Sequence, residues 1–157
     1  MKTILTPVDF SEVSDTVINA SVALAKAIDA RIVLLTVVQP PVFTAEYSSL
    51  MDNIVEITAI GERTAARQLA ATQERLTKEG LVVETAQFSG APVVHIAEQA
   101  DKFNPDYIVM GSHGHTAFYD LLVGSTTHGV LKRAQCPVII VPPKEQQRTK
   151  QRSSERH

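Results

Sequence analysis

The sequence predicts an α/β protein with an open, doubly wound, mostly parallel sheet of five strands and helices on both faces. Five short runs of strand-forming residues alternate along the chain with four segments of helical periodicity, an order that favours a parallel sheet. Several of the strand runs are continuously apolar, which is typical of parallel strands covered on both faces. A chain of 157 residues with 44% hydrophobic and 20% charged residues can bury one core of this kind.

The predicted strands are short apolar runs bounded by proline, glycine or polar residues. The run from Arg31 to Val38 is the clearest, because it is apolar apart from Arg31 and Thr36 and is followed by Gln39-Pro40-Pro41. The run 81–88 alternates only loosely, as an edge strand does. Right-handed crossovers then connect the strands through the helices. The predicted strands are residues 2–8, 31–38, 81–88, 106–110 and 137–142.

The first predicted helix follows Pro7-Val8-Asp9. Ser11 is a residue type that caps helices, and Glu12 places a negative charge where the helix dipole favours it. Apolar residues then recur at helical spacing as far as Ala27. We therefore expect Ser11 to be the N-cap of this helix.

Three further helices are predicted. Residues 51–79 form a long one that Gly80 closes, although Gly61 lies inside it and weakens the prediction. Another opens at Gly90-Ala91-Pro92, with proline in its first turn. The last covers residues 126–134, and residues 39–50 are expected to form a surface loop.

Bulk properties predict one domain over residues 1–143 and a polar, disordered tail over 144–157, which contains five Lys or Arg and two Glu. The formal net charge of -2 gives no general reason to expect nucleic-acid binding. The single Cys136 cannot form an internal disulfide, so a reducing cytoplasmic setting is expected. No segment approaches the ~20 apolar residues of a membrane span, and the amino terminus does not resemble a signal peptide.

Residues 110–129, MGSHGHTAFYDLLVGSTTHG, hold four of the seven glycines and follow the fourth predicted strand. In open α/β sheets, ligands bind beyond the carboxyl ends of the strands, where the strand order reverses. Gly111 and Gly114 allow a main chain to approach a ligand closely. Gly124-Ser125-Thr126-Thr127 opens the last helix, and free N–H groups with hydroxyls suit phosphate. The apolar residues between these glycines predict a short packed helical turn.

Each of these residues also has a purely structural interpretation. Asp9 could cap the first turn of the helix that follows it. Gly111 and Gly114 could be ordinary turn residues, and Ser125 is a suitable N-cap whether or not it contacts a ligand. These alternatives remain open from the sequence.

Other chemistries are weakly supported. His113, His115 and His128 have no carboxylate or cysteine at a recognised spacing to complete a metal site. A triad of Asp9, His113 and Ser125 would lack the Gly-x-Ser-x-Gly turn of a serine hydrolase. The chain also has no Gly-x-Gly-x-x-Gly after its first strand and no P-loop lysine.

Four motifs together resemble the universal stress protein family, in its ATP-binding branch. The resemblance covers Lys2 to Pro142, is strongest in the last forty residues of that range and is weakest between residues 40 and 80, where the family varies. The motifs are Pro7-Val8-Asp9-Phe10-Ser11, Met110-Gly111-Ser112-His113-Gly114, Gly124-Ser125 and the run from Cys136 to Pro142.

This resemblance implies a Rossmann-like domain of the adenine nucleotide alpha hydrolase type that holds ATP. Mg²⁺ or Mn²⁺ would be bound mainly by phosphate oxygens and water, with no ligand set from the protein. Many relatives have valine at Thr126 and a basic residue at His115, so these positions depart from the family pattern. By resemblance, Pro7, Val8 and Asp9 flank adenine and ribose, Val37 packs on the ring, Met110 and Gly111 line the ribose, and His113, Gly114, Gly124, Ser125 and Thr126 surround the phosphates.

The function expected from the resemblance is that of a nucleotide-responsive regulator or stress-survival factor rather than a fast enzyme, with no catalytic residue assigned. It would be a cytoplasmic homodimer that pairs through residues 137–142 and acts on an unidentified protein partner, without membrane insertion. A slow ATPase or phosphotransferase using the same pocket is one alternative. A nucleotide-free dimeric interaction module is another, although that branch of the family tends to lack the glycine spacing seen here.

Overall fold

The structure is a computed structural model that describes residues 1–41, 51–112 and 123–144. Most of the predicted loop 39–50, most of the predicted helical turn before Gly124 and the predicted tail beyond residue 144 lie outside these ranges. The strands are β1 (Lys2–Pro7), β2 (Ala30–Val38), β3 (Val83–Ser89), β4 (Tyr107–Gly111) and β5 (Val138–Val141). The helices are α1 (Ser14–Ile28), α2 (Met51–Lys78), α3 (Pro92–Phe103) and α4 (Ser125–Arg133).

The five strands form one sheet in the order β3-β2-β1-β4-β5, and each neighbouring pair is parallel. The order reverses between β1 and β4, because the chain adds β2 and β3 on one side of β1 and then β4 and β5 on the other. The predicted fold class is therefore confirmed, with β3 and β5 as the edge strands.

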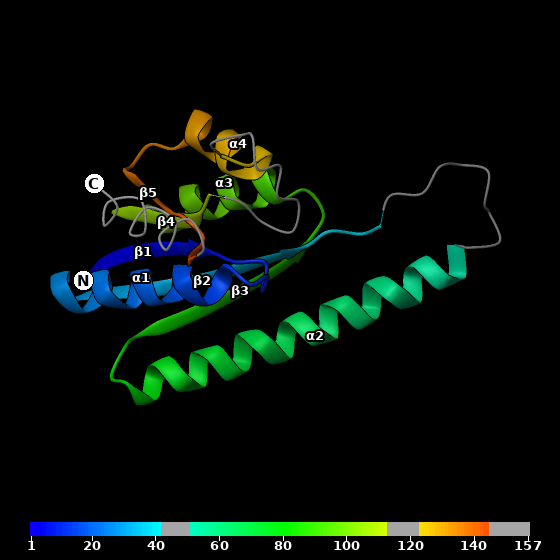
Figure 1. The fold of residues 1–157 in the computed structure, drawn as a ribbon, viewed down its shortest axis with the longest axis horizontal. Coiled ribbons are helices and arrows are strands. Elements are labelled where there is room, and N and C mark those ends of the chain that lie inside the picture. Colours follow the sequence, from blue (N-terminus) through cyan, green and yellow to red (C-terminus); the bar gives the residue numbers. More distant parts are fainter. Residues whose placement is uncertain (42–50, 113–122, 145–157) are drawn as a thin grey trace, which may run out of the picture.

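The helices cover the sheet in two layers. Successive residues of a strand point to opposite faces, so Ile4 joins the core under α1 and α2, whereas Leu5 joins the core under α3 and α4. Figure 1 shows α2 on one side of the sheet and α3 with α4 on the other. The interior strands are therefore buried on both faces, which explains their continuously apolar sequences.

The prediction that Ser11 caps α1 is wrong. The helix begins at Ser14, with Val13 in the N-cap position and no side-chain cap. The backbone N–H of Ser14 donates to the carbonyl of Ser11 at 3.0 Å, so Ser11 belongs to a separate turn before the helix. Asp9 takes the capping role in that turn, because its Oδ1 accepts from the N–H of Ser11 at 2.9 Å.

The other helices differ from their predicted bounds by one or two residues. The α2 helix runs through Gly61 without interruption and ends before Gly80, whose φ of 88° is the left-handed conformation that glycine favours. The α4 helix begins at Ser125, one residue earlier than predicted, and β3 begins two residues later than its predicted start at Leu81. Within the described ranges, none of the helices is both long enough and apolar enough to cross a membrane.

The close contact between α3 and α4 depends on Gly129. A Cβ built at Gly129 would lie 2.8 Å from Cγ2 and 3.0 Å from Cγ1 of Val93. Valine in a helix has one strongly preferred rotamer, so Val93 cannot easily turn away. A glycine in the middle of this nine-residue helix is therefore explained by packing.

We expect Gly129→Ala to lower the free energy of unfolding by about 1–2 kcal/mol, because overpacking by ~1–3 kcal/mol exceeds the gain of up to ~1 kcal/mol in helix propensity. Gly61→Ala is the matched comparison, since its Cβ would lie an ordinary 3.5 Å from Val38 Cγ1. That variant should be as stable as the unaltered chain or more so. Urea unfolding of both measures the difference, and equal stabilities would contradict the packing argument.

Candidate functional site

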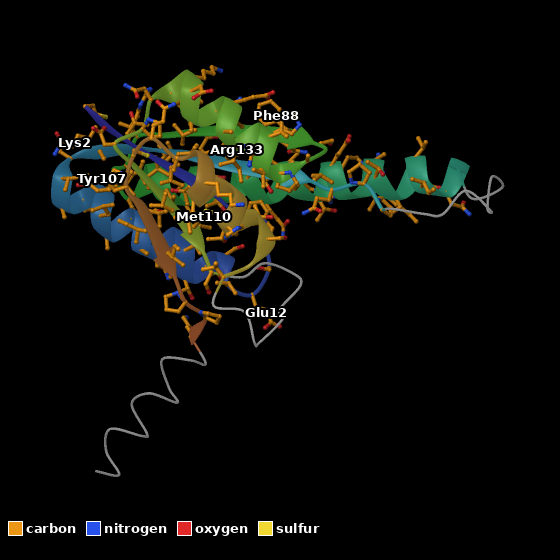
Figure 2. All side chains as sticks on the ribbon, turned by 90° about the horizontal axis from the view of Figure 1, so that it is seen from above. Lys2, Glu12, Phe88, Tyr107, Met110 and Arg133 are labelled. Atoms are coloured by element: carbon orange, nitrogen blue, oxygen red, sulfur yellow. The ribbon has the colours of Figure 1, made fainter. Side chains whose placement is uncertain are left out.

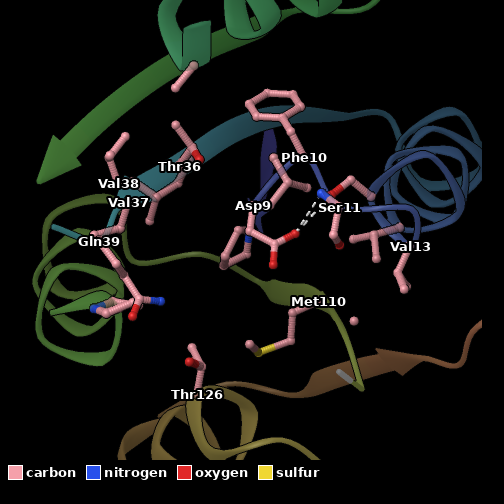
Figure 3. A pocket seen from close by; sticks show the side chains of 18 of the residues that line it. Asp9, Phe10, Ser11, Val13, Thr36, Val37, Val38, Gln39, Met110 and Thr126 are labelled. Carbon is pink, nitrogen blue, oxygen red and sulfur yellow. Dashed lines mark hydrogen bonds between the residues drawn. The ribbon is translucent and has the colours of Figure 1, made fainter. Parts of the chain in front are cut away.

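A cavity of about 600 Å³ lies at the carboxyl ends of β1, β2 and β4, where the strand order reverses. This volume is within the range of ~300–1,000 Å³ that is usual for small-molecule sites. Its walls come from the β1–α1 turn, the end of β2, the middle of α2 and the start of α4. Figure 3 shows the side chains of Asp9, Val37, Met110 and Thr126 around this space.

The β1–α1 turn forms one wall and is tied to the sheet. The N–H of Val8 donates to the carbonyl of Leu35 at 2.8 Å, which holds the turn against β2. Asp9 Oδ1 accepts from the Ser11 N–H, drawn in Figure 3, and from Ser14 Oγ at 3.3 Å. Phe10 has a φ of 56°, which is an unusual conformation for a bulky residue. The turn is therefore a constrained element, held by Asp9 on the edge of the cavity.

The start of α4 forms the opposite wall and is fastened to the end of β4. Thr127 Oγ1 donates to the carbonyl of Gly111 at 2.8 Å, and the N–H of Gly124 donates to the carbonyl of Ser112 at 2.6 Å. Gly124 occupies the N-cap position, and no side chain caps the helix. The first N–H groups of a helix have no intrahelical acceptors, so this end of α4 presents donors and a partial positive charge.

Most of the predicted site residues meet at this cavity. Asp9 has the structural role that the sequence left open and also lies in the cavity wall, so the two interpretations coexist. His113 and Gly114 lie outside the described residues. The predicted residues that line the cavity are Pro7, Val8, Asp9, Val37, Met110, Gly111, Gly124, Ser125 and Thr126.

Sequence reasoning missed the wall that α2 contributes. Gly61, Thr64, Ala65 and Gln68 line the cavity, and their spacing of three, four and seven residues places them on one helix face. The small and polar residues on one face of α2 could have indicated a binding surface. Nothing in the local sequence shows, however, that this face points toward β1. Other lining residues that were missed include Phe10, Ser11, Val13, Thr36, Val38, Gln39, Pro92 and Ile96.

The described part of the cavity wall has little charge. Asp9 is its only acidic side chain, and it includes no Lys or Arg. Among the described residues, no group of three or more His, Cys, Asp or Glu is placed to hold a metal ion. Cys136 is not in the wall, and burial together with the nearby Asp106 carboxylate raises the pKa of its thiol, so it remains protonated and suits a packing role.

Comparison with known proteins agrees with this fold. A family model described as the universal stress protein family matches residues 1–142. A universal stress protein of Methanocaldococcus jannaschii is 32% identical over 149 residues, which are 92% of this chain and 85% of that protein. Universal stress protein UspA from Lactobacillus plantarum has a TM-score of 0.79 at 25% identity, over 89% of this chain and 97% of that one.

Two more distant structures have the same fold and contain nucleotides. A universal stress protein solved in complex with cAMP has a TM-score of 0.62 at 23% identity, over 90% of this chain and 97% of that one. A universal stress protein from Archaeoglobus fulgidus in complex with dAMP has a TM-score of 0.59 at 19% identity, over 89% and 96%. Because the family model spans nearly all of the described domain and the relatives match along their length, this chain belongs to the universal stress protein family.

Proposed function

We propose that this chain binds ATP in the cavity between the β1–α1 turn and the start of α4, and acts in the cytoplasm as a nucleotide-responsive regulator or stress-survival factor. The observation that carries the proposal is the convergence of Asp9, Val37 and the Gly124–Thr126 helix start on one cavity of about 600 Å³. An apolar middle with polar ends suits a nucleotide, whose base and ribose need packing and whose phosphates need donors.

The two ends of the cavity fit different parts of ATP. Val8, Val37 and Met110 offer apolar surface for the base and ribose, and Asp9 supplies an acceptor beside them. Ser125 and Thr126 add hydroxyls to the uncapped end of α4, which suits phosphate oxygens. The described wall has no Lys or Arg, so a divalent ion held by phosphate oxygens and water would be needed to neutralise part of the triphosphate charge.

The relatives support the ligand class. Two universal stress proteins of the same fold were solved with cAMP and with dAMP, which are both adenine nucleotides. The choice of ATP rests on the glycines and hydroxyls that follow β4 in this chain, because they provide for more than one phosphate.

A regulatory role follows from where the cavity lies. One ligand would contact the β1–α1 turn, α2 and α4 at once, and so would stabilise one arrangement of the three. An unidentified protein partner would bind the surface that the nucleotide stabilises in this way. Pairing of two copies along β5 would cover an edge strand whose Ile139 is 37% exposed, and so would remove a template for aggregation.

Freshly purified protein should release an adenine nucleotide on denaturation or bind ATP with Mg²⁺ in calorimetry, as mass spectrometry and titration would show. Gly124→Val should weaken ATP binding at least ~10-fold, because Gly124 lies in the cavity wall at the start of α4 and valine is a poor N-cap there. Leu131→Ala, on the same helix but outside the wall, is the control. Absence of both release and binding would refute the proposal, and steady ADP production would favour the ATPase alternative.

Removal of divalent ions should lower the affinity for ATP much more than the affinity for AMP. The described wall has no Lys or Arg to replace the metal, and the triphosphate carries more charge than the monophosphate. We expect EDTA to lower ATP affinity about 10-fold or more and AMP affinity by less than about threefold, measured by titration at constant ionic strength. An equal loss for both nucleotides would show that the metal does not act on the outer phosphates.

The Asp9 carboxylate should matter to the ligand as well as to the turn. Asparagine keeps the Oδ1 acceptor that Ser11 and Ser14 use, so Asp9→Asn should unfold close to the temperature of the unaltered chain. ATP affinity should nevertheless fall about threefold to 10-fold, because a charged acceptor binds donors more strongly. Asp9→Ala should lose both stability and affinity. Unchanged affinity in Asp9→Asn would leave Asp9 with its structural role alone.

A further inference from the structure

The α2 wall of the cavity lies where the helix changes from packed to unsupported. Ala65, Leu69 and Leu76 are buried, at 7%, 4% and 0% exposure, and they fasten the second half of α2 to the sheet. Among the described side chains of α2 that precede Ala65, none is buried. Figure 2 shows this first half of the helix projecting beyond the rest of the domain. Gly61 and Thr64 therefore line the cavity just before the point where burial of α2 begins.

The projecting half leaves large apolar side chains exposed in the described structure. Val55, Ile57 and Ile60 are 70%, 51% and 48% exposed, although all three are apolar. Packing against the sheet therefore contributes little to the position of α2 on this side of Ala65. A further attachment would help to hold the helix at Gly61 and Thr64, because a cavity wall needs a defined position to select a ligand.

Glu62 makes that attachment through two hydrogen bonds to the end of β3. Its carboxylate Oε1 accepts from Ser89 Oγ at 2.7 Å, and its backbone carbonyl accepts from Gln87 Nε2 at 2.8 Å. Both donors lie on the last residues of an edge strand, and Glu62 immediately follows the wall residue Gly61 and is two residues before the wall residue Thr64. The pair of bonds acts on the backbone and on the side chain of the same residue.

The end of β3 is also connected to the end of β2, which forms another wall of the cavity. Ser89 is registered with Val38 of β2, and the N–H of Gly90 donates to the carbonyl of Val38 at 2.9 Å. Val38 itself lines the cavity, and its Cγ1 lies 3.5 Å from a Cβ built at Gly61. A movement of Glu62 away from β3 would therefore separate α2 from Val38 and widen the cavity.

We propose that Glu62 is a positioning residue, which holds the α2 wall against the end of β3 and so sets the width of the ligand cavity. The proposal rests on the nucleotide-binding function argued above and deepens it, because Glu62 acts on the ligand only through Gly61, Thr64 and Gln68. Glu62 itself is not in the cavity wall.

The test is calorimetric titration of the full chain with ATP and Mg²⁺. Glu62→Ala should lower the affinity for ATP about threefold to 10-fold, since it removes a charge-assisted hydrogen bond that holds the α2 wall. Glu62→Gln should retain near-normal affinity, because its side-chain oxygen still accepts from Ser89. Ser89→Ala should match Glu62→Ala, and the double variant should be no weaker than either single variant, because both remove the same bond.

Glu74→Ala is the matched control, because Glu74 lies on the same helix, pairs only with the exposed Lys78 in the described structure and is remote from the cavity. Equal ATP affinities for Glu62→Ala and Glu74→Ala would overturn the positioning role while leaving the proposed function intact. A complete lack of binding by the unaltered chain would overturn both.

Hydrogen exchange gives a second readout that needs no ligand. In Glu62→Ala, amide exchange should accelerate around residues 61–65 and stay unchanged around Leu69 and Leu76, since burial holds the second half of the helix. Uniform acceleration along α2 would indicate a general loss of stability, and it would contradict a local attachment.

Discussion

The site depends on the reversal of strand order between β1 and β4. Crossovers between parallel strands are right-handed, so a chain that moves from β1 to β2 and β3 places its helices on one face, and a chain that moves from β4 to β5 places them on the other. The connections that leave the carboxyl ends of β1 and β4 therefore turn away from each other. The space between them cannot be filled by either connection, and the cavity occupies it.

Backbone hydrogen bonds convert this space into a defined site. The β1–α1 turn is bonded to β2 through Val8 and Leu35, while the end of β4 is bonded to β5 through Ser112 and Val141. Ser112 also accepts from Gly124, which brings the start of α4 to the cavity. These bonds lie at the carboxyl ends of β1, β2 and β4, whose interior residues are buried, so the surrounding core holds the two main walls in position. The α2 wall is different, because polar hydrogen bonds at Glu62 join it to the end of β3 where the burial of the helix begins.

Much of the fold could be predicted because its signals are local. Continuous apolar runs indicated parallel strands, and Gly80 and Pro92 marked helix ends correctly. The start of α1 was misplaced because Ser11 is a good capping residue by type, whereas Asp9 takes the turn and Phe10 adopts a left-handed conformation between them. Local preferences could not show which of two neighbouring cap-forming residues the backbone would use.

By itself, the sequence determined the order of the elements, the parallel sheet and the residues that follow β1 and β4, because these depend on short-range periodicity and on residue type. Only the tertiary structure decided which distant segments share a wall. Gly61, Thr64 and Gln68 lie more than fifty residues after Asp9 and more than fifty residues before Ser125. No local preference of the sequence could show that these segments meet. The burial of Leu69 and Leu76 and the hydrogen bonds of Glu62 bring them together, because packing and long-range hydrogen bonds act across space rather than along the chain.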